Sequence, residues 1–319
     1  MPIAVRSCRG LTAAALLLAL PSVALADSLG FSLPFQTSQT STVVNTVSLP
    51  GTVVNAAGSG DSSESAWYKR VDKAQATQPS WITPLATTTP RLEEEVRYDQ
   101  FWQNMGNGAT LDNYDGGKGL ELIPTTTNEV ILNVPPYEVR THEKAAQGFG
   151  DDTFLLVKQR LVSENAENGD YIVTAFLSVL GPTGTDAFTN HAWEVTPTIA
   201  GGKGFGNFDV QATSGITLPT SHQDTIGDAV ATNIALQYHV GKYWPEFEMN
   251  DTYWSGGERS GKNQVLLTPG VIIGRFKLSG RMKANFGVGY QWAVAPALVK
   301  EPLTPTYTDA WISTVRVSF

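Results

Sequence analysis

The chain has 319 residues, with 22 lysines and arginines against 30 aspartates and glutamates, which gives a net charge of −8. This acidic balance argues against a nucleic-acid partner, because such partners usually require a basic surface. Charged residues make up only 16% of the chain, below the roughly 25% of ordinary soluble domains. The single cysteine, Cys8, lies near the N-terminus, so the rest of the chain has no thiol for a disulfide, a zinc site or a nucleophile.

Residues 1–26 are predicted to be a cleavable export signal. Arg6 and Arg9 precede an apolar run at 11–20, and small residues at 24–26 form a cleavage site. The apolar run is shorter than the roughly 17 residues that a membrane-spanning helix needs. We therefore expect the protein to be exported from the cytoplasm.

The segment 27–80 is predicted to be a low-complexity periplasmic leader. Between 28 and 60 it has no charged residue and is rich in Ser, Thr, Val, Asn and Gly. Such a composition predicts an extended or poorly ordered chain. Two functional alternatives are a plug inside a barrel lumen and a docking arm in the periplasm.

Short alternating runs of apolar and polar residues, separated by Gly, Asn, Asp and Pro clusters, predict consecutive antiparallel strands over 81–319. The fold class expected is all-β, an up-and-down antiparallel transmembrane barrel of about twelve strands, although ten or fourteen would also fit. The expected strands are roughly 91–104, 117–125, 127–136, 152–164, 169–181, 190–200, 205–218, 226–241, 243–255, 262–275, 276–293 and 307–319.

The alternation predicts which side chains share a face of each strand. In the strand at 226–241, Ile234 and Tyr238 belong to an apolar face, whereas Asn233 and Gln237 belong to a polar one. A soluble β-sandwich has the same period with its apolar face turned inward. Alternation alone therefore leaves both folds open.

Two further features favour the membrane barrel. Aromatic residues gather near strand ends, as at Tyr243 and Trp244, where the headgroup layer of a bilayer would place a girdle of rings. The strand predicted at 276–293 also carries Arg281 and Lys283 on its polar face. A dry sandwich core could not hold such charges unpaired, but a wet or salt-bridged lumen could.

The chain ends on a predicted strand with Trp311, Val315, Val317 and the terminal Phe319 on one face. This ending resembles the C-terminal signal of bacterial outer-membrane barrels. The resemblance implies recognition by the barrel-assembly machinery and contact with outer-membrane lipid. Together with the export signal, it predicts a location in the bacterial outer membrane.

Several stretches resemble a narrower family, the outer-membrane proteins regarded as transporters of a meta-pathway of phenol degradation. They are Gln-Pro-Ser-Trp at 78–81, Thr-Thr-Thr-Pro-Arg-Leu at 87–92, Leu-Glu-Leu-Ile-Pro at 120–124, Val-Pro-Pro-Tyr at 134–137, Thr-Pro-Gly at 268–270 and Ile-Gly-Arg at 273–275. The resemblance covers about 81–319. It implies an outer-membrane barrel that passes aromatic or other small organic molecules, and it brings no catalytic motif.

The first predicted strand has the densest charge, and its alternation predicts which of these charges face a lumen. The candidates for lining the lumen are Glu93, Glu95, Arg97, Asp99, His239, Arg281, Lys283 and Arg316. Glu94 would point to lipid, which is tolerable only near an interface. The charges would form either salt bridges that brace the barrel or a solute-selective constriction. Other lumen candidates are Glu194, Asp209, Gln211, Gln237, Glu246 and Glu248.

A membrane-embedded hydrolase is an alternative of another class, and it would need a serine nucleophile beside a histidine base. The best available pair is His239 with Ser255 or Ser260. No two histidines lie close in sequence, so no metal site and no cofactor are predicted.

The sequence thus predicts a non-enzymatic, channel-like protein for passive uptake or efflux of small solutes, including aromatic or hydrophobic ones. A structural or adhesive barrel without an open pore is the first alternative, and the hydrolase is the second.

Overall fold

The computed structural model describes residues 59–106, 108–114, 119–142, 144–295 and 307–319. The chain divides into two units, Met1–Ala56 and Ala57–Phe319, and the description concerns the second. The predicted export signal and residues 27–58 of the predicted leader lie outside the described residues. The elements are α1 (Ser59–Ala76), β1 (Glu95–Asn104), β2 (Thr110–Tyr114), β3 (Gly119–Leu122), β4 (Asn128–Leu132), β5 (Tyr137–Arg140), β6 (Ala146–Phe149), β7 (Asp152–Glu164), β8 (Tyr171–Gly181), β9 (Glu194–Phe205), β10 (Phe208–Pro219), β11 (Ala229–Tyr238), β12 (Tyr243–Trp254), the short 3₁₀ helix η3 (Gly257–Arg259), β13 (Lys262–Lys277), β14 (Lys283–Ala293) and β15 (Asp309–Ser318).

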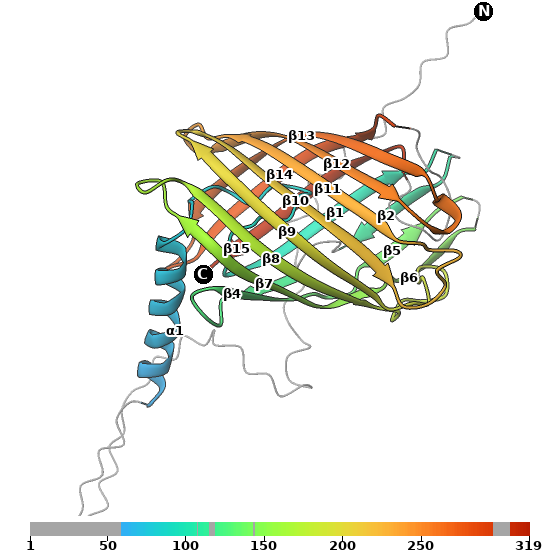
Figure 1. Ribbon diagram of the computed structural model, residues 1–319. Helices are drawn as coiled ribbons and strands as arrows, with labels where there is room; N and C mark the ends of the chain where they lie inside the picture. Colours follow the sequence, from blue (N-terminus) through green and yellow to red (C-terminus); the bar gives the residue numbers. More distant parts are fainter. Residues whose placement is uncertain (1–58, 107, 115–118, 143, 296–306) are drawn as a thin grey trace, which may run out of the picture. The chain divides into compact units, whose positions relative to one another are not determined.

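The strands form one antiparallel sheet that closes on itself where β1 pairs with β15 (Figure 1). Three pairs of segments, β2 with β3, β4 with β5 and β6 with β7, are halves of single barrel strands, because the two halves of each pair bond to the same neighbouring strands. The described residues therefore form a closed barrel of twelve strands, which confirms the predicted fold class. Each predicted strand has a counterpart, and the unpredicted segments are β2, β5 and β6.

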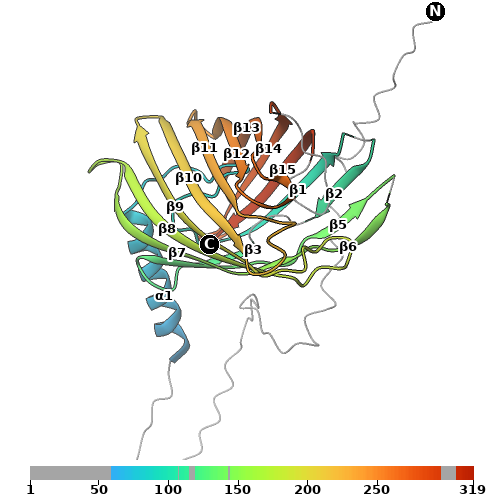
Figure 2. The same ribbon diagram turned by 45° about the vertical axis from the view of Figure 1, so that its right-hand side comes forward.

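The two ends of the barrel differ in the length of the connections between strands. The proximal end is where β1 begins and β15 ends, and the distal end is the opposite one. α1 lies at the proximal end (Figure 2). Proximal turns are short, as at Gly206 and Asn207 between β9 and β10, whereas distal connections such as 182–193 are longer. Long loops at one end and short turns at the other are typical of outer-membrane barrels.

The outside of the barrel is apolar and the inside is polar. On β11, Tyr238 is 48% exposed and Leu236 37%, whereas Gln237 is 1% exposed. On β15, Trp311 is 55% exposed and Arg316 only 1%, with the predicted alternation between the two faces. A soluble sandwich would bury the apolar set, so this inverted arrangement excludes that alternative and suits a surface surrounded by lipid.

Tandem aromatic residues do not lie together in a girdle as predicted. Tyr243 is exposed on the outside, but its neighbour Trp244 is buried inside, and Tyr253 and Trp254 divide in the same way. Successive side chains of a strand point to opposite faces. Only one ring of each tandem pair can therefore reach the outer surface.

The predicted leader is wrong in conformation over Ser59–Ala76, which forms helix α1 rather than an extended chain. Trp67, Val71 and Ala74 follow helical spacing and pack against Leu92 and Ile123. The helical spacing of these apolar residues was visible in the sequence, but the residues against which they pack were not. Among the described residues, no helix combines the length and the apolar character needed to cross a membrane.

Candidate functional site

The segment between α1 and β1, residues 77–94, folds into the barrel, and we call it the plug. Leu85 is fully buried there, and its N–H donates to a carboxylate of Glu246, 161 residues away in sequence. β1 begins at Glu95 rather than near residue 91 as predicted. The residues predicted to start the first barrel strand therefore belong to the plug.

Two glutamates of β12 accept hydrogen bonds from successive peptide groups at the plug tip. Glu246 Oε1 accepts from Leu85 N–H at 3.1 Å. Glu248 accepts from Ala86 N–H at 2.8 Å and from Thr87 N–H at 2.6 Å. Successive amides that converge on one carboxylate form an anion-binding nest. In this barrel the anion is a wall residue and the nest belongs to the plug.

Arginines on β1 and β15, which pair with each other, bind the carbonyl groups of the same segment. Arg97 Nη2 donates to Leu85 O at 2.6 Å. Arg316 donates to Thr83 O and, at 2.7 Å, to Pro84 O. Hydrogen bonds to charged groups contribute roughly 1.5–3 kcal/mol each. The charges of the wall therefore hold the plug by its backbone.

A second charged group binds the part of the plug that approaches β1. Lys158 Nζ donates to Arg91 O at 3.1 Å and pairs with Glu129 at 2.8 Å. Glu129 also accepts from Glu93 N–H at 2.6 Å. Lys158 and Glu129 are both fully buried, so each has its charge balanced by the other and by plug peptide groups.

Uncharged side chains satisfy further polar groups of the plug. Thr174 Oγ1 donates to Pro90 O at 2.6 Å. Gln211 accepts from Thr89 Oγ1 at 2.7 Å and donates to Ile82 O at 3.0 Å. Because buried peptide groups need such partners, the inner wall fits this segment in particular.

The two ends of the plug are tied together at the proximal end. Gln78 donates to Leu92 O at 2.8 Å and accepts from Leu92 N–H at 3.0 Å. Arg91 donates to Pro79 O at 2.7 Å and pairs with Glu93 at 2.8 Å. The plug is therefore a closed loop that enters and leaves the lumen at the same end.

Leu85 fits a recess lined by glycines on β13 and β14. A Cβ added at Gly270, Gly287 or Gly289 would lie 2.4, 2.6 or 2.7 Å from a Leu85 methyl carbon. Real Cβ contacts are essentially never that short. Glycine at these positions therefore makes room for Leu85, which packs in a buried cluster with Trp244.

Asp99 and Glu95, two of the predicted lumen residues, are buried inside the barrel with different partners. Asp99 pairs with Arg97 at 2.7 Å. Glu95 faces Glu121 across the β1–β3 ladder. Among the described residues, Glu95 Oε1 and both carboxylate oxygens of Glu121 have no hydrogen-bond partner. Glu121 and Glu129, which lie in the strands predicted at 117–125 and 127–136, are buried charged residues that were not among the predicted lumen residues.

Two predicted placements are wrong, those of Arg281 and Glu94. Arg281 lies in the turn between β13 and β14, not in mid-strand, and it pairs with Asp72 of α1. Lys283 is the first residue of β14 and lines a cavity at the proximal mouth. Glu94 does not face lipid but is buried beneath α1, where it accepts from Trp67 Nε1 at 2.8 Å. Burial raises the pKa of the Glu94 carboxyl.

The predicted serine–histidine pair does not form. His239 stacks on Trp244 with ring centres 4.3 Å apart and contacts Gly241 O at 2.8 Å in a proximal turn. Ser255 and Ser260 lie beyond the distal end of β12, a full strand away. In the part of the chain that the structure describes, no cluster of three or more His, Cys, Asp or Glu residues could hold a metal ion.

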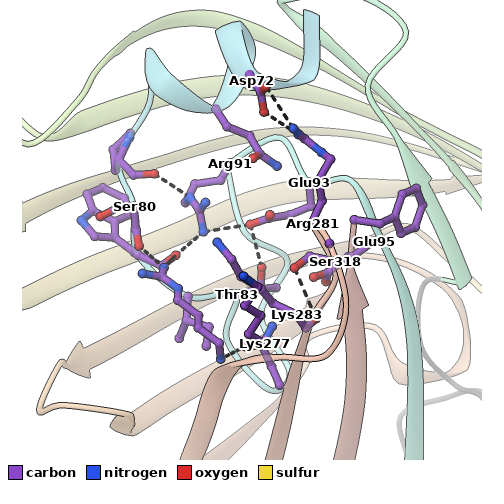
Figure 3. Close-up of a pocket in the computed structure, with 18 residues that line it drawn as sticks. Asp72, Ser80, Thr83, Arg91, Glu93, Glu95, Lys277, Arg281, Lys283 and Ser318 are labelled. Atoms are coloured by element: carbon purple, nitrogen blue, oxygen red, sulfur yellow. Dashed lines mark hydrogen bonds and ion pairs between the residues drawn. The ribbon is translucent and has the colours of Figure 1, made fainter. Parts of the chain in front are cut away.

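Two cavities lie on opposite sides of the plug tip. The proximal cavity, of about 530 Å³, lies between the plug, α1 and the proximal ends of β13 and β14 (Figure 3). The distal cavity, of about 210 Å³, lies against β7 to β11 and is lined mainly by hydroxyl groups and small residues. Its lining residues are Thr88, Leu156, Phe176, Ser178, Thr196, Thr198, Thr213, Gly215, Ala231 and Asn233.

Comparison with known proteins gives structural matches only. No family model matches the sequence, and neither does any curated protein. The COG4313 outer membrane channel from Pseudomonas putida F1 aligns over 70% of this chain and 92% of its own, with 12% identity and a TM-score of 0.50. A NanC porin aligns over 70% of this chain and 98% of its own, with 6% identity and a TM-score of 0.44. The first of these matches shows that the chain has the barrel fold of an outer-membrane channel.

Proposed function

We propose that this protein is an outer-membrane channel through which small molecules pass passively, and that the plug narrows or closes the path. The observation that carries the proposal is the set of charged wall residues, exemplified by Glu248, Arg97 and Arg316, that bind plug peptide groups. We assign the proximal end to the periplasm because the short turns of outer-membrane barrels lie on that side.

The size of the barrel supports a slender path rather than a wide pore. Twelve strands enclose an interior that side chains can largely fill, and here the plug fills part of it as well. Passage then depends on the position of the plug. Each bond from a charged wall residue to the plug opposes its displacement by roughly 1.5–3 kcal/mol.

The lining of the distal cavity favours passage of small uncharged solutes, including aromatic ones. Its lining residues carry no charge, and they combine hydroxyl groups such as those of Thr196 and Ser178 with the ring of Phe176. Such a lining can accept and donate hydrogen bonds while it contacts an apolar body. The resemblance to transporters of a phenol-degradation pathway supports the same class of solute.

A structural barrel without an open pore is the second candidate, since wall residues hydrogen-bond the peptide groups of the plug where it lies. Single-channel recording in planar bilayers separates the two. We expect low conductance from the intact chain and a several-fold rise from a variant that lacks residues 59–92. A control shows whether the variant is folded: its barrel should stay folded in detergent that has not been heated. A folded variant that stays silent would favour the structural barrel.

A further inference from the structure

The proximal cavity carries more basic than acidic side chains, and most of its acids are already paired (Figure 3). Its charged lining residues are Asp72, Arg91, Glu93, Glu95, Arg275, Lys277, Arg281 and Lys283. Arg281 pairs with Asp72, and Arg91 pairs with Glu93. The remaining acidic side chain, Glu95, is only 3% exposed. The cationic charge left over belongs to Arg275 and the two lysines.

Lys277 and Lys283 are directly opposite each other in the β13–β14 ladder, and both line the cavity. Within the described residues, neither lysine forms an ion pair with an acid. Like charges directly opposite on a sheet are destabilising. An anion placed between the two ammonium groups would turn this repulsion into attraction.

Arg275 adds a third cation through an irregularity of the same strand. The β13–β14 register shifts between Ile273 and Phe276, and Arg275 has a φ of 59°. A bulge of this kind re-aims a side chain, and a non-glycine residue in the left-handed region carries a backbone cost. The Arg275 side chain reaches the plug, where it donates to Trp81 O at 3.1 Å. The bulge therefore places a cation where the plug and the cavity meet.

Apolar groups line the same cavity. They come from the plug residues Pro79, Trp81 and Ile82. A volume of about 530 Å³ lies within the range of small-molecule sites, which combine apolar walls with a few fixed polar groups. The cavity thus suits a ligand that has both a negative group and an apolar body.

We propose that the proximal cavity binds a small organic anion, with its carboxylate between Lys277 and Lys283 and its apolar body against Trp81. This site goes beyond the proposed channel function, because binding at the mouth requires no passage through the lumen. It also differs in chemistry from the distal cavity, which is lined by uncharged residues. Charge assistance from two ammonium groups makes such hydrogen bonds shorter and stronger than neutral ones.

Equilibrium dialysis of labelled benzoate against the full chain in nonionic detergent tests this site, with protein-free micelles subtracted. We expect saturable binding of benzoate, at least tenfold weaker binding of benzyl alcohol, and at least a tenfold loss of benzoate affinity in Lys277→Gln/Lys283→Gln. The matched control is Lys69→Gln/Lys73→Gln, which removes the same charge from exposed positions of α1 that do not line the cavity. The control should bind benzoate within twofold of the unaltered chain.

Three results would overturn the proposal: no saturable binding of benzoate to the unaltered chain, equal binding of benzyl alcohol, or an equal loss of affinity in both double variants. Conductance recorded on the same preparations keeps this test separate from the channel proposal. A channel that conducts but does not bind benzoate refutes only the anion site. A silent barrel that binds benzoate through the two lysines refutes only the channel.

Discussion

Glu248→Gln tests whether the wall holds the plug. The Glu248 carboxylate accepts from Ala86 N–H at 2.8 Å and from Thr87 N–H at 2.6 Å. The amide of glutamine keeps one acceptor oxygen and turns an NH₂ group toward the other plug N–H. At least one charge-assisted bond is lost, at a cost of roughly 1.5–3 kcal/mol. Because about 1.4 kcal/mol corresponds to a factor of ten, the fraction of time that the plug is displaced should rise about ten- to 150-fold.

The assay is single-channel recording, in which Glu248→Gln should open more often than the unaltered chain at the same voltage. Glu121→Gln is the matched control. Glu121 is also fully buried and inside the barrel, but its carboxylate oxygens form no hydrogen bond with the plug or with any other described residue. Its substitution should leave the opening frequency unchanged. If both variants open equally often, loss of lumen charge explains the effect and the assigned role of the plug contacts is wrong.

Three further predictions concern the plug and α1. Gly289→Ala would place a Cβ 2.7 Å from Leu85 Cδ1, with no other atom closer than 3.1 Å, so it should raise the opening frequency. Adding Leu85→Ala should then give less than the sum of the two single effects, and strictly additive effects would refute the role of the glycine recess. Burial raises the pKa of Glu94, so the folded protein holds the carboxyl proton of Glu94 more tightly than the unfolded chain does. Docking of α1 should therefore be strongest at a pH below the ordinary carboxyl pKa and should weaken as the pH rises through the raised pKa. Protection of the α1 amides from hydrogen exchange, corrected for intrinsic rates, should fall with rising pH in the unaltered chain but not in Glu94→Gln. The same pH dependence in both chains would contradict the role of Glu94. Asp72→Asn should change α1 protection by no more than about 1 kcal/mol, because Asp72 and Arg281 are 56% and 40% exposed; a larger loss would show that this pair anchors the helix.

The strands could be predicted because their signal is local. The strand predicted at 152–164 is β7, Asp152–Glu164, and the facing of β11 and β15 follows from the two-residue period. The segments β2, β5 and β6 were missed because each is separated from a predicted strand by residues that break the alternating pattern. The prolines at 135 and 136, between β4 and β5, also interrupt the pattern by removing two N–H donors from the ladder.

The plug could not be predicted because its partners are distant in sequence. Arg316 binds Thr83 O across 233 residues, and Glu246 binds Leu85 N–H across 161. Charge patterning did predict that Arg97 and Arg316 point inward, but composition does not reveal that their partners are peptide groups. The prolines at 79, 84 and 90 were the available signal, since proline excludes this stretch from the interior of a sheet.

The most direct test of the central claim is to tether the plug reversibly to the wall. Asn250 Nδ2 donates to Thr87 Oγ1 at 3.3 Å, and the chain's single cysteine, Cys8, lies in the predicted export signal, so Thr87→Cys/Asn250→Cys introduces one defined pair. Single-channel conductance is then recorded before and after reduction. If plug movement controls passage, the oxidised protein stays at its lowest conductance and reduction restores the openings. Equal conductance in the two states would contradict the claim that the plug controls the path.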